Sequence, residues 1–226
     1  TSNLTEDQGV VSIPIKKAVK TGSKLVVIDP RETELTRYSD IWLRPKPGTE
    51  AILVCGIIRV ILDESLDDHE FLSEQCKNLT EFKNDIWSYD LVKVSEVTSV
   101  SQAGIQQAAR IIAKTSTCSY IYGLDSLTSK YPGEYVKSII NLALVTGNIG
   151  KSGSGLFPMF HGANQQGSRD IGCTPDLLPG YRKVSSESER KTLESIWGSK
   201  VPNEAGIGIQ QLEDGLKEGN IKVLYL

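Results

Sequence analysis

An acid, a proline and an arginine stand together at Asp29-Pro30-Arg31, directly after one of the chain's most apolar runs. The run over 24–29 is continuous rather than alternating, which predicts a strand buried on both faces. Ligands of parallel sheets bind beyond the carboxyl ends of the strands, where Asp29 can accept from a ribose or a guanine edge and Arg31 can pair with phosphate. The alternative is a plain strand-ending turn with a surface ion pair, and these three residues alone favour that alternative.

A second candidate is the turn Pro47-Gly48-Thr49-Glu50, which precedes a stretch expected to be helical from Glu50 to about Leu62. Backbone N–H groups at a helix N-terminus can face an anion, while the Glu50 carboxylate can accept from a purine edge. Alternatively, Thr49 caps the helix and Glu50 stabilises its first turn, each by about 1 kcal/mol or less. Taken alone, the turn favours this capping interpretation.

The third candidate is a glycine-rich loop over 158–172 that contains amides, a histidine, an arginine and an aspartate. His161 is a candidate proton donor, but no cysteine, serine or acid lies at a spacing that defines a nucleophilic site, so a hydrogen-bonding role is favoured. Gly150-Lys151-Ser152 does not end a phosphate-binding loop, because Val145 stands where that pattern requires glycine. The loop therefore predicts a hydrogen-bonding lining and no catalytic residue.

Positioning these candidates requires alternating strands and helices. Apolar periodicity and turn residues predict strands over 24–29, 41–44, 118–122 and 221–226, and helices over 13–19, 50–62, 68–75, 102–114, 131–146, 193–197 and 209–217. This order predicts an α/β fold with a Rossmann-like, mainly parallel sheet flanked by helices. We expect a first domain over 1–157 and, over 158–226, a loop-rich portion that begins a second α/β domain. Because a final strand has no loop after it, we expect further sequence on both sides.

Composition limits the classes of partner. Hydrophobic residues make up 39% of the 226 residues and charged residues 23%, with a net charge of −3. No broad basic surface is expected, which argues against nucleic acid and anionic membranes as principal partners. No apolar run approaches the roughly 20 residues that cross a bilayer, so we expect no membrane insertion.

The four cysteines, Cys55, Cys76, Cys118 and Cys173, form no C-x-x-C pair. They therefore predict neither a zinc site nor an iron–sulfur cluster, and buried free thiols are the favoured interpretation. Free thiols suit a reducing compartment, so we expect a cytoplasmic location.

Five blocks in order resemble the molybdopterin oxidoreductase family, which includes formate dehydrogenases, periplasmic nitrate reductases and the G-type subunit of respiratory complex I. Residues 1–6 resemble the family's G-x-N-x-x-E/D segment, 24–37 its strand followed by D-P-R-x-T-x-T, and 46–51 its P-G-T-D-x-A turn. Residues 142–150 resemble L-x-x-L-T-G-N-I-G, and 164–172 resemble N-x-Q-G-A-x-D-M-G, followed at 174–181 by a segment like L-P-x-x-x-P-G-Y. The resemblance covers nearly the whole chain.

The resemblance implies a molybdopterin guanine dinucleotide cofactor, in the bis-MGD form with molybdenum or tungsten. The residues implied to line one guanine dinucleotide are Ser2, Asn3, Glu6, Asp29, Pro30, Arg31, Thr33, Gly48, Thr49 and Glu50, with Asn164 and Gln166 nearer the pterin. Glu50 stands where the family usually has aspartate, and its carboxylate would face the N1 and N2 hydrogens of guanine.

The departures from the family concern the chemistry. The family's iron–sulfur cysteines, its metal-ligating cysteine or selenocysteine and its C-terminal pterin domain have no counterpart here, so the resemblance implies an internal segment with no catalytic residue or metal ligand of its own. An iron–sulfur cluster is expected only in a preceding part. Formate dehydrogenases carry Arg-Gly-Gln where this chain has Phe160-His161-Gly162, which argues against formate as the substrate.

The expected partners are the remaining domains of the same large subunit and an electron-transfer subunit, with self-association as another way to cover exposed apolar surface. One alternative is a segment of a complex I G-type electron-transfer subunit that keeps the fold without molybdenum. Another, suggested only by the strand before Asp29, is a self-standing Rossmann-like nucleotide binder.

Overall fold

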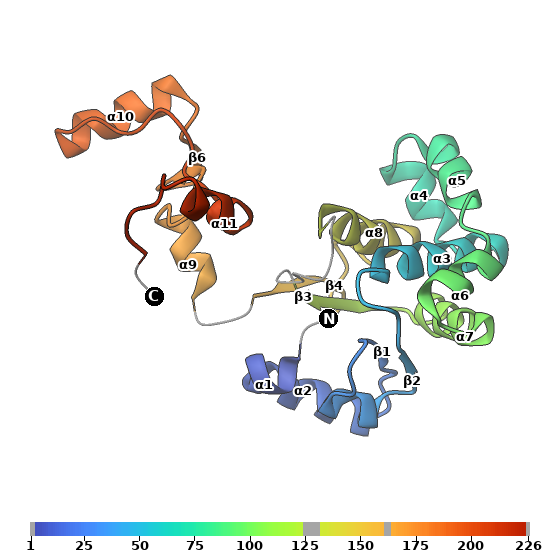
Figure 1. Ribbon diagram of the computed structural model, residues 1–226. Coiled ribbons are helices and arrows are strands. Elements are labelled where there is room, and N and C mark those ends of the chain that lie inside the picture. Colours follow the sequence, from blue (N-terminus) through green and yellow to red (C-terminus); the bar gives the residue numbers. More distant parts are fainter. Residues whose placement is uncertain (1–2, 124–131, 161–163, 225–226) are drawn as a thin grey trace. The chain divides into compact units, whose positions relative to one another are not determined.

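The computed structural model describes residues 3–123, 132–160 and 164–224, and the chain divides into two compact units, Thr1–His161 and Gly162–Leu226. The sequence predicted a boundary between 157 and 158. Each unit has its own set of helices and strands (Figure 1).

The first unit alternates helices with short strands, in the order α1 (Leu4–Asp7), α2 (Gly9–Lys20), β1 (Val26–Ile28), the 3-10 helix η1 (Glu34–Tyr38), β2 (Ile41–Leu43), α3 (Glu50–Asp63), α4 (His69–Gln75), α5 (Leu79–Trp87), α6 (Leu91–Thr98), α7 (Gln102–Ala113), β3 (Ser119–Gly123), α8 (Pro132–Val145) and β4 (Gly155–Met159). β1 pairs in parallel with β2, and β3 in parallel with β4. The described residues therefore confirm an α/β fold with helices and small parallel sheets.

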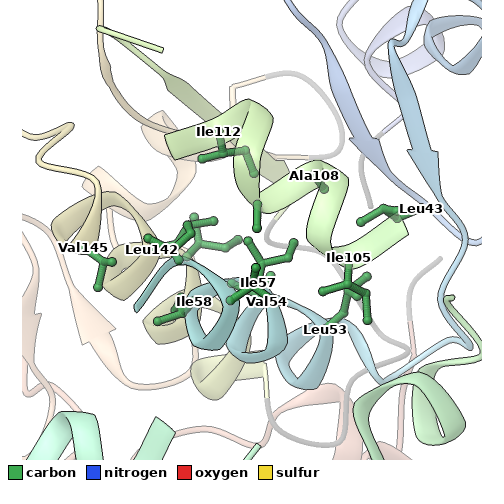
Figure 2. Close-up of a cluster of buried hydrophobic side chains, with 14 of the residues drawn as sticks. Leu43, Leu53, Val54, Ile57, Ile58, Ile105, Ala108, Ile112, Leu142 and Val145 are labelled. Atoms are coloured by element: carbon green, nitrogen blue, oxygen red, sulfur yellow. The ribbon is translucent and has the colours of Figure 1, made fainter. Parts of the chain in front are cut away.

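Helix α3 is the centre of the first unit and lies among α8, α7 and α6 (Figure 1). Its sequence is apolar around most of its circumference, as expected of a helix that is covered on several sides. Figure 2 shows Leu53, Val54 and Ile57 of α3 facing Ile105 and Ala108 of α7, with Leu142 of α8 alongside. Leu53 and Ile57 are completely buried, so α3 is fixed by close packing on these sides.

Buried polar groups link β3 to the end of α8. The Asn148 Oδ1 atom accepts from the backbone N–H of Cys118 at 2.8 Å, and the Tyr120 hydroxyl lies 2.6 Å from Thr146 Oγ1. Gly147 ends the helix in the left-handed conformation, with φ +59°. These bonds fix where the last turn of α8 sits against the beginning of β3.

The second unit contains α9 (Gln165–Asp170), β5 (Leu177–Leu178), β6 (Arg182–Lys183), α10 (Glu187–Trp197) and α11 (Ile209–Lys217). β5 and β6 pair antiparallel, and a small cluster of Leu178, Val184, Leu193 and Val201 is buried. The sequence predicted helices near α10 and α11, but it predicted neither the short β5–β6 pair nor α9, which lies within the glycine-rich loop expected over 158–172.

Three further expectations differ from the structure. Helices α5 and α6 were not predicted, because each is short, at 9 and 8 residues, and offers little periodicity to recognise. Strand β4 was not predicted, and it overlaps the start of the loop expected from 158; its pairing with β3 stabilises it. The strand predicted over 221–226 is absent from its described residues, 221–224, which have no partner strand among the described segments.

Candidate functional site

The turn after β1 is fixed by hydrogen bonds around Asp29, which is only 2% exposed. Its Oδ1 atom accepts from the backbone N–H of Arg31 at 2.8 Å and lies 3.6 Å from the Arg31 Nε atom. Its backbone carbonyl accepts from the indole Nε1 of Trp42 at 2.8 Å. The Asp29 carboxylate is therefore held inward at the carboxyl end of β1.

Two arginines stand at this turn with exposed side chains. The Arg31 side chain is 65% exposed, and Arg44 Nε donates to the carbonyl of Pro30 at 2.9 Å. Thr33 follows the turn as a buried residue at the N-cap of η1, and its carbonyl accepts from both the N–H and the hydroxyl of Thr36 within that helix. The exposed guanidinium groups suit a phosphate, whereas Thr33 serves the backbone of the turn.

The turn before α3 differs from its expected capping role. Gly48 has φ +86°, and the Thr49 hydroxyl donates to the carbonyl of Lys46 at 2.7 Å. Thr49 occupies the N-cap position but its side chain makes no capping bond, so the predicted side-chain cap is wrong. Because its hydroxyl is used in the turn, no N-cap side chain covers the first N–H groups of α3.

Glu50 is the least expected member of the site. It is only 3% exposed, and its Oε1 atom is buried without a hydrogen-bond partner among the described residues. Leaving a buried acceptor unpaired costs about 1–3 kcal/mol, and more when the group is charged. A simple helix-stabilising acid would lie in solvent, so capping alone does not explain the position of Glu50.

Tyr135, in the first turn of α8, was missed by the sequence reasoning. It is 7% exposed, and burial and then the negative charges of Glu50 and Asp29 raise the pKa of its phenol above the usual value. Helix α8 packs against α3, and the phenol lies within electrostatic reach of Glu50 and Asp29, so the three residues belong to one region of the first unit. The available signal was its spacing, four residues before Ile139 on the predicted helix, which places it on the buried face.

The N-terminal segment lies beside the same strand ends. Asn3 Oδ1 accepts from the Thr5 hydroxyl at 2.8 Å, Glu6 is exposed, and α1 contacts η1. Gln8 Nε2 donates to the carbonyl of Phe160, just after β4, at 3.1 Å. Ser2 and His161 lie outside the described residues, so the structure places neither of these candidates.

Asn164 and Gln166 belong to the second unit. Asn164 has φ +58° before α9, and a Cβ at Gly167 would come within 2.5 Å of its Oδ1 atom. Gln166 Nε2 donates to Asp170 Oδ1 at 3.0 Å and to the Tyr181 hydroxyl at 2.6 Å. Within this unit the amide of Gln166 is therefore engaged with its own neighbours.

The cysteines are all free, but not all buried. Cys55, Cys76 and Cys118 are half-buried, and Cys173 is exposed, so the expectation of buried thiols is wrong for Cys173. Across the described part of the chain, no group of three His, Cys, Asp or Glu side chains is arranged to hold a metal ion. Among these same residues, no helix combines the length and the apolar character needed to cross a membrane.

Enzymes with different named activities are similar to this chain along nearly all of its length. The catalytic subunit of assimilatory nitrate reductase from Bacillus subtilis (strain 168) is 34% identical over 100% of the chain, which covers 32% of that protein. The F420-dependent formate dehydrogenase subunit alpha of Methanocaldococcus jannaschii is 34% identical over 100% of the chain and 33% of its own length. Formate dehydrogenase H of Escherichia coli (strain K12) is 30% identical over 99% of the chain and 32% of its own length.

A solved structure agrees with these relatives. Acetylene hydratase from Pelobacter acetylenicus superposes with a TM-score of 0.62 at 32% identity, covering 67% of this chain and 21% of that protein. The chain spans about a third of the length of the three relatives named above. None of them is named as a complex I subunit, so they give that alternative no support.

The family profile described as molybdopterin oxidoreductase matches residues 1–226. It covers the Asp29 and Glu50 turns together with the amide-containing segment 164–172 of the second unit. The chain belongs to the molybdopterin oxidoreductase family.

Proposed function

We propose that this chain forms one wall of the cofactor cleft in the large subunit of a molybdenum or tungsten oxidoreductase, where it holds one guanine dinucleotide of bis-MGD. Membership of the family implies a molybdopterin cofactor. The relatives share this segment although their names give different reactions, among them nitrate reduction and formate oxidation. A segment common to such enzymes is better suited to binding a shared cofactor than to selecting a substrate.

The observation that carries the proposal is the unpartnered Oε1 atom of Glu50, a residue that is only 3% exposed. Such an acceptor fits a ligand edge with N–H donors, and guanine presents its N1 and N2 hydrogens in a pattern that one carboxylate can accept. The buried Asp29 carboxylate suits a ribose hydroxyl. The residues present therefore fit a guanine nucleotide at this end of the sheet.

Charge on the same side of the first unit suits the phosphates. The exposed Arg31 guanidinium and the first N–H groups of α3, which no N-cap side chain covers, supply positive potential beside Asp29 and Glu50. Ser2, Asn3, Glu6, Pro30, Thr33, Gly48 and Thr49 complete this proposed nucleotide wall, and Asn164 and Gln166 are assigned to the pterin.

The metal of the bound cofactor supplies the redox chemistry, and the residues of this chain bind and orient the cofactor. The metal ligand and an iron–sulfur cluster are assigned to other parts of the same subunit. The parallel pairs β1–β2 and β3–β4 are assigned to one Rossmann-like domain over 1–157, with a second α/β domain beginning at 158.

The proposed partners are the other domains of the subunit and a separate electron-transfer subunit. Support comes from relatives that are named as alpha subunits, such as the NADPH-Fe(3+) oxidoreductase subunit alpha of Geobacter sulfurreducens. The four free cysteines fit a reducing compartment, and we assign the protein to the cytoplasm.

Nucleotide titration of the purified chain tests the proposal, with GDP as the probe because it presents guanine, ribose and two phosphates. Glu50→Gln keeps the side-chain size and removes the charge, so we expect GDP affinity to fall about 10- to 100-fold. Glu64→Gln is the matched control, since Glu64 lies just after the other end of α3 and its carboxylate accepts from Arg110 at 2.7 and 2.8 Å. This control should bind GDP as the unchanged chain does.

The whole protein gives an independent test of the cofactor. We expect it to release guanine nucleotide on acid hydrolysis and to contain molybdenum or tungsten. Intact protein that contains a pterin but no guanine nucleotide would contradict the guanine assignment, and intact protein with neither metal nor pterin would contradict the cofactor.

A further inference from the structure

Helices α3 and α8 begin on the same side of the first unit. Near their far ends, the backbone N–H of Asp68, which follows α3, donates to the carbonyl of Val145 at 2.9 Å. Figure 2 shows Ile58 of α3 and Val145 of α8 toward that same end. Glu50 and Tyr135 therefore occupy corresponding positions in the first turns of two neighbouring helices.

The beginning of this helix pair has an unusual charge balance. Asp29 and Glu50 are both buried carboxylates, at 2% and 3% exposed, and the charges of both act on the Tyr135 phenol. Asp29 already has a donor in the backbone N–H of Arg31 and an ion-pair partner in the Arg31 guanidinium. Glu50 Oε1 has no partner among the described residues, so a neutral O–H donor on the other carboxylate oxygen would hold Oε1 toward a ligand without competing for it.

The Tyr135 phenol is suited to that role because it keeps its proton. Burial raises the pKa of Tyr135, and the charges of Glu50 and Asp29 raise it further, so the group remains an O–H donor throughout the physiological range. Packing alone does not account for a phenol here, since a phenyl ring would fill the same apolar space without bringing a hydroxyl among buried acids.

We infer that Tyr135 is a positioning residue for the nucleobase: with the nucleotide bound, its hydroxyl donates to one oxygen of Glu50 and directs the other toward the N–H groups of the base. This inference rests on the proposed function. Tyr135 does not touch the ligand, and it acts through the orientation of Glu50. Without the hydroxyl, the Glu50 side chain has more than one orientation of similar energy, and selectivity for the base falls.

The test compares GDP with IDP, which lacks the 2-amino group but keeps the N1 hydrogen. A Glu50 carboxylate fixed toward guanine accepts from both positions, so we expect the unchanged chain to prefer GDP about tenfold or more. Tyr135→Phe should reduce this preference to within about threefold, because a loosely held carboxylate gains less from the second donor. Binding of both nucleotides is measured by calorimetric titration, and thermal unfolding confirms that each variant is folded.

Tyr120→Phe is the matched control. Tyr120 is another buried tyrosine of the same core, but its hydroxyl bonds to Thr146 Oγ1 at 2.6 Å near the opposite end of α8. This variant should lose stability, because a buried hydrogen bond is broken, and should keep the full preference for GDP.

The outcomes separate the two claims. Equal weakening of GDP and IDP by Tyr135→Phe, with the preference retained, would show that Tyr135 only fills space and would overturn the inference while leaving the nucleotide site intact. An unchanged preference with unchanged affinity overturns it equally. If the unchanged chain binds neither nucleotide, the proposed function fails, and the role of Tyr135 fails with it.

Discussion

The first and second units cover their apolar side chains to different degrees. In the first unit a cluster that includes Leu53, Ile57 and Ile105 is buried around α3. Among the described residues of the second unit, such a cluster is formed by Leu178, Val184, Leu193 and Val201, while Ile171, Ile196, Trp197 and Val223 are among its exposed apolar side chains. The unit with the larger core also carries Asp29 and Glu50, so the proposed nucleotide wall rests on a rigid base.

The difference also suggests what the second unit contributes. Large exposed apolar side chains in a small unit mark surface that another segment covers. Under the proposed function, this surface faces the remaining domains of the same subunit, and the chain spans about a third of the length of the three relatives named above. The first unit therefore has a large core of its own, and the second unit has a small one.

The largest effect is expected from removing core volume in the first unit. Ile57 is completely buried on α3, and Ile57→Ala should lower the free energy of unfolding by about 2–5 kcal/mol. Leu193→Ala is the corresponding change in the second unit, and it should leave unfolding of the first unit unchanged. Denaturant unfolding followed by fluorescence in a Trp197→Phe background reports on Trp42 and Trp87 of the first unit. An equal loss from both variants would show that the two units unfold as one.

Two left-handed glycines give a smaller contrast. Gly147 has φ +59°, and an added Cβ would lie 2.1 Å from Asp68 Oδ2, whereas Gly198 has φ +66° with nothing within 4 Å of its Cβ position. Gly198→Ala should cost about 1–2 kcal/mol of backbone strain alone. Gly147→Ala should cost roughly 1–2 kcal/mol more, because the Asp68 side chain must move from its capping position. Equal costs for the two variants in chemical unfolding would show that Asp68 moves freely.

Thiol reactivity should also separate the units. Cys173 is exposed in the second unit, while burial raises the pKa of Cys55 and Cys118 in the first. Fewer thiolates and less access should make Cys55 and Cys118 at least about tenfold slower than Cys173 in alkylation at pH 8. Peptide mapping of the labelled chain gives the three rates. Similar rates would mean that the first unit opens readily.

The smallest effect concerns acid stability near the end of α8. The Phe71 N–H and then the Lys151 ammonium, at 3.2 Å, lower the pKa of Asp68. A carboxyl whose folded-state pKa is depressed contributes stability above its unfolded value of about 3.9, and loses it as pH falls through the lower folded value. Asp68→Asn keeps a cap but loses the ion pair, so it should cost about 1 kcal/mol or less at pH 7.

This difference between Asp68→Asn and the unchanged chain should disappear in strong acid. Urea unfolding at pH 7 and at pH 2 measures it. A gap that grows at pH 2 would contradict the assignment of the shift to these contacts.

Sequence patterns predicted the elements whose apolar stripe is continuous. The helices expected over 50–62 and 102–114 correspond to Glu50–Asp63 and Gln102–Ala113, because one buried face determines each of them. Strand β4 was missed because it depends on pairing with the distant β3, with Tyr120 opposite Leu156. The strand expected over 221–226 failed in its described residues for the opposite reason, since apolar character without a partner strand forms no ladder.

The candidate site shows the same division between local and tertiary information. The turns at Asp29 and Gly48 were recognisable from local residue types, and the structure describes both. The burial of Glu50 and the effect of its charge on the Tyr135 phenol were not predictable, because both arise where α3 packs against α8. Capping was the favoured interpretation of Thr49 and Glu50, and it failed because the Thr49 hydroxyl bonds to Lys46 while Glu50 turns inward.

The central claim is that Glu50 is held unpaired for a nucleotide, and thermal unfolding of the first unit with and without GDP tests it most directly. Without GDP, Glu50→Gln should melt about 2–4 °C higher than the unchanged chain, because it removes an unpartnered buried charge. With GDP at about 100 times its dissociation constant, the unchanged chain should gain about 2.7 kcal/mol, and the order should reverse. Two results together would contradict the claim. Without GDP, Glu50→Gln would melt at a lower temperature than the unchanged chain, and the unchanged chain would not be stabilised by GDP.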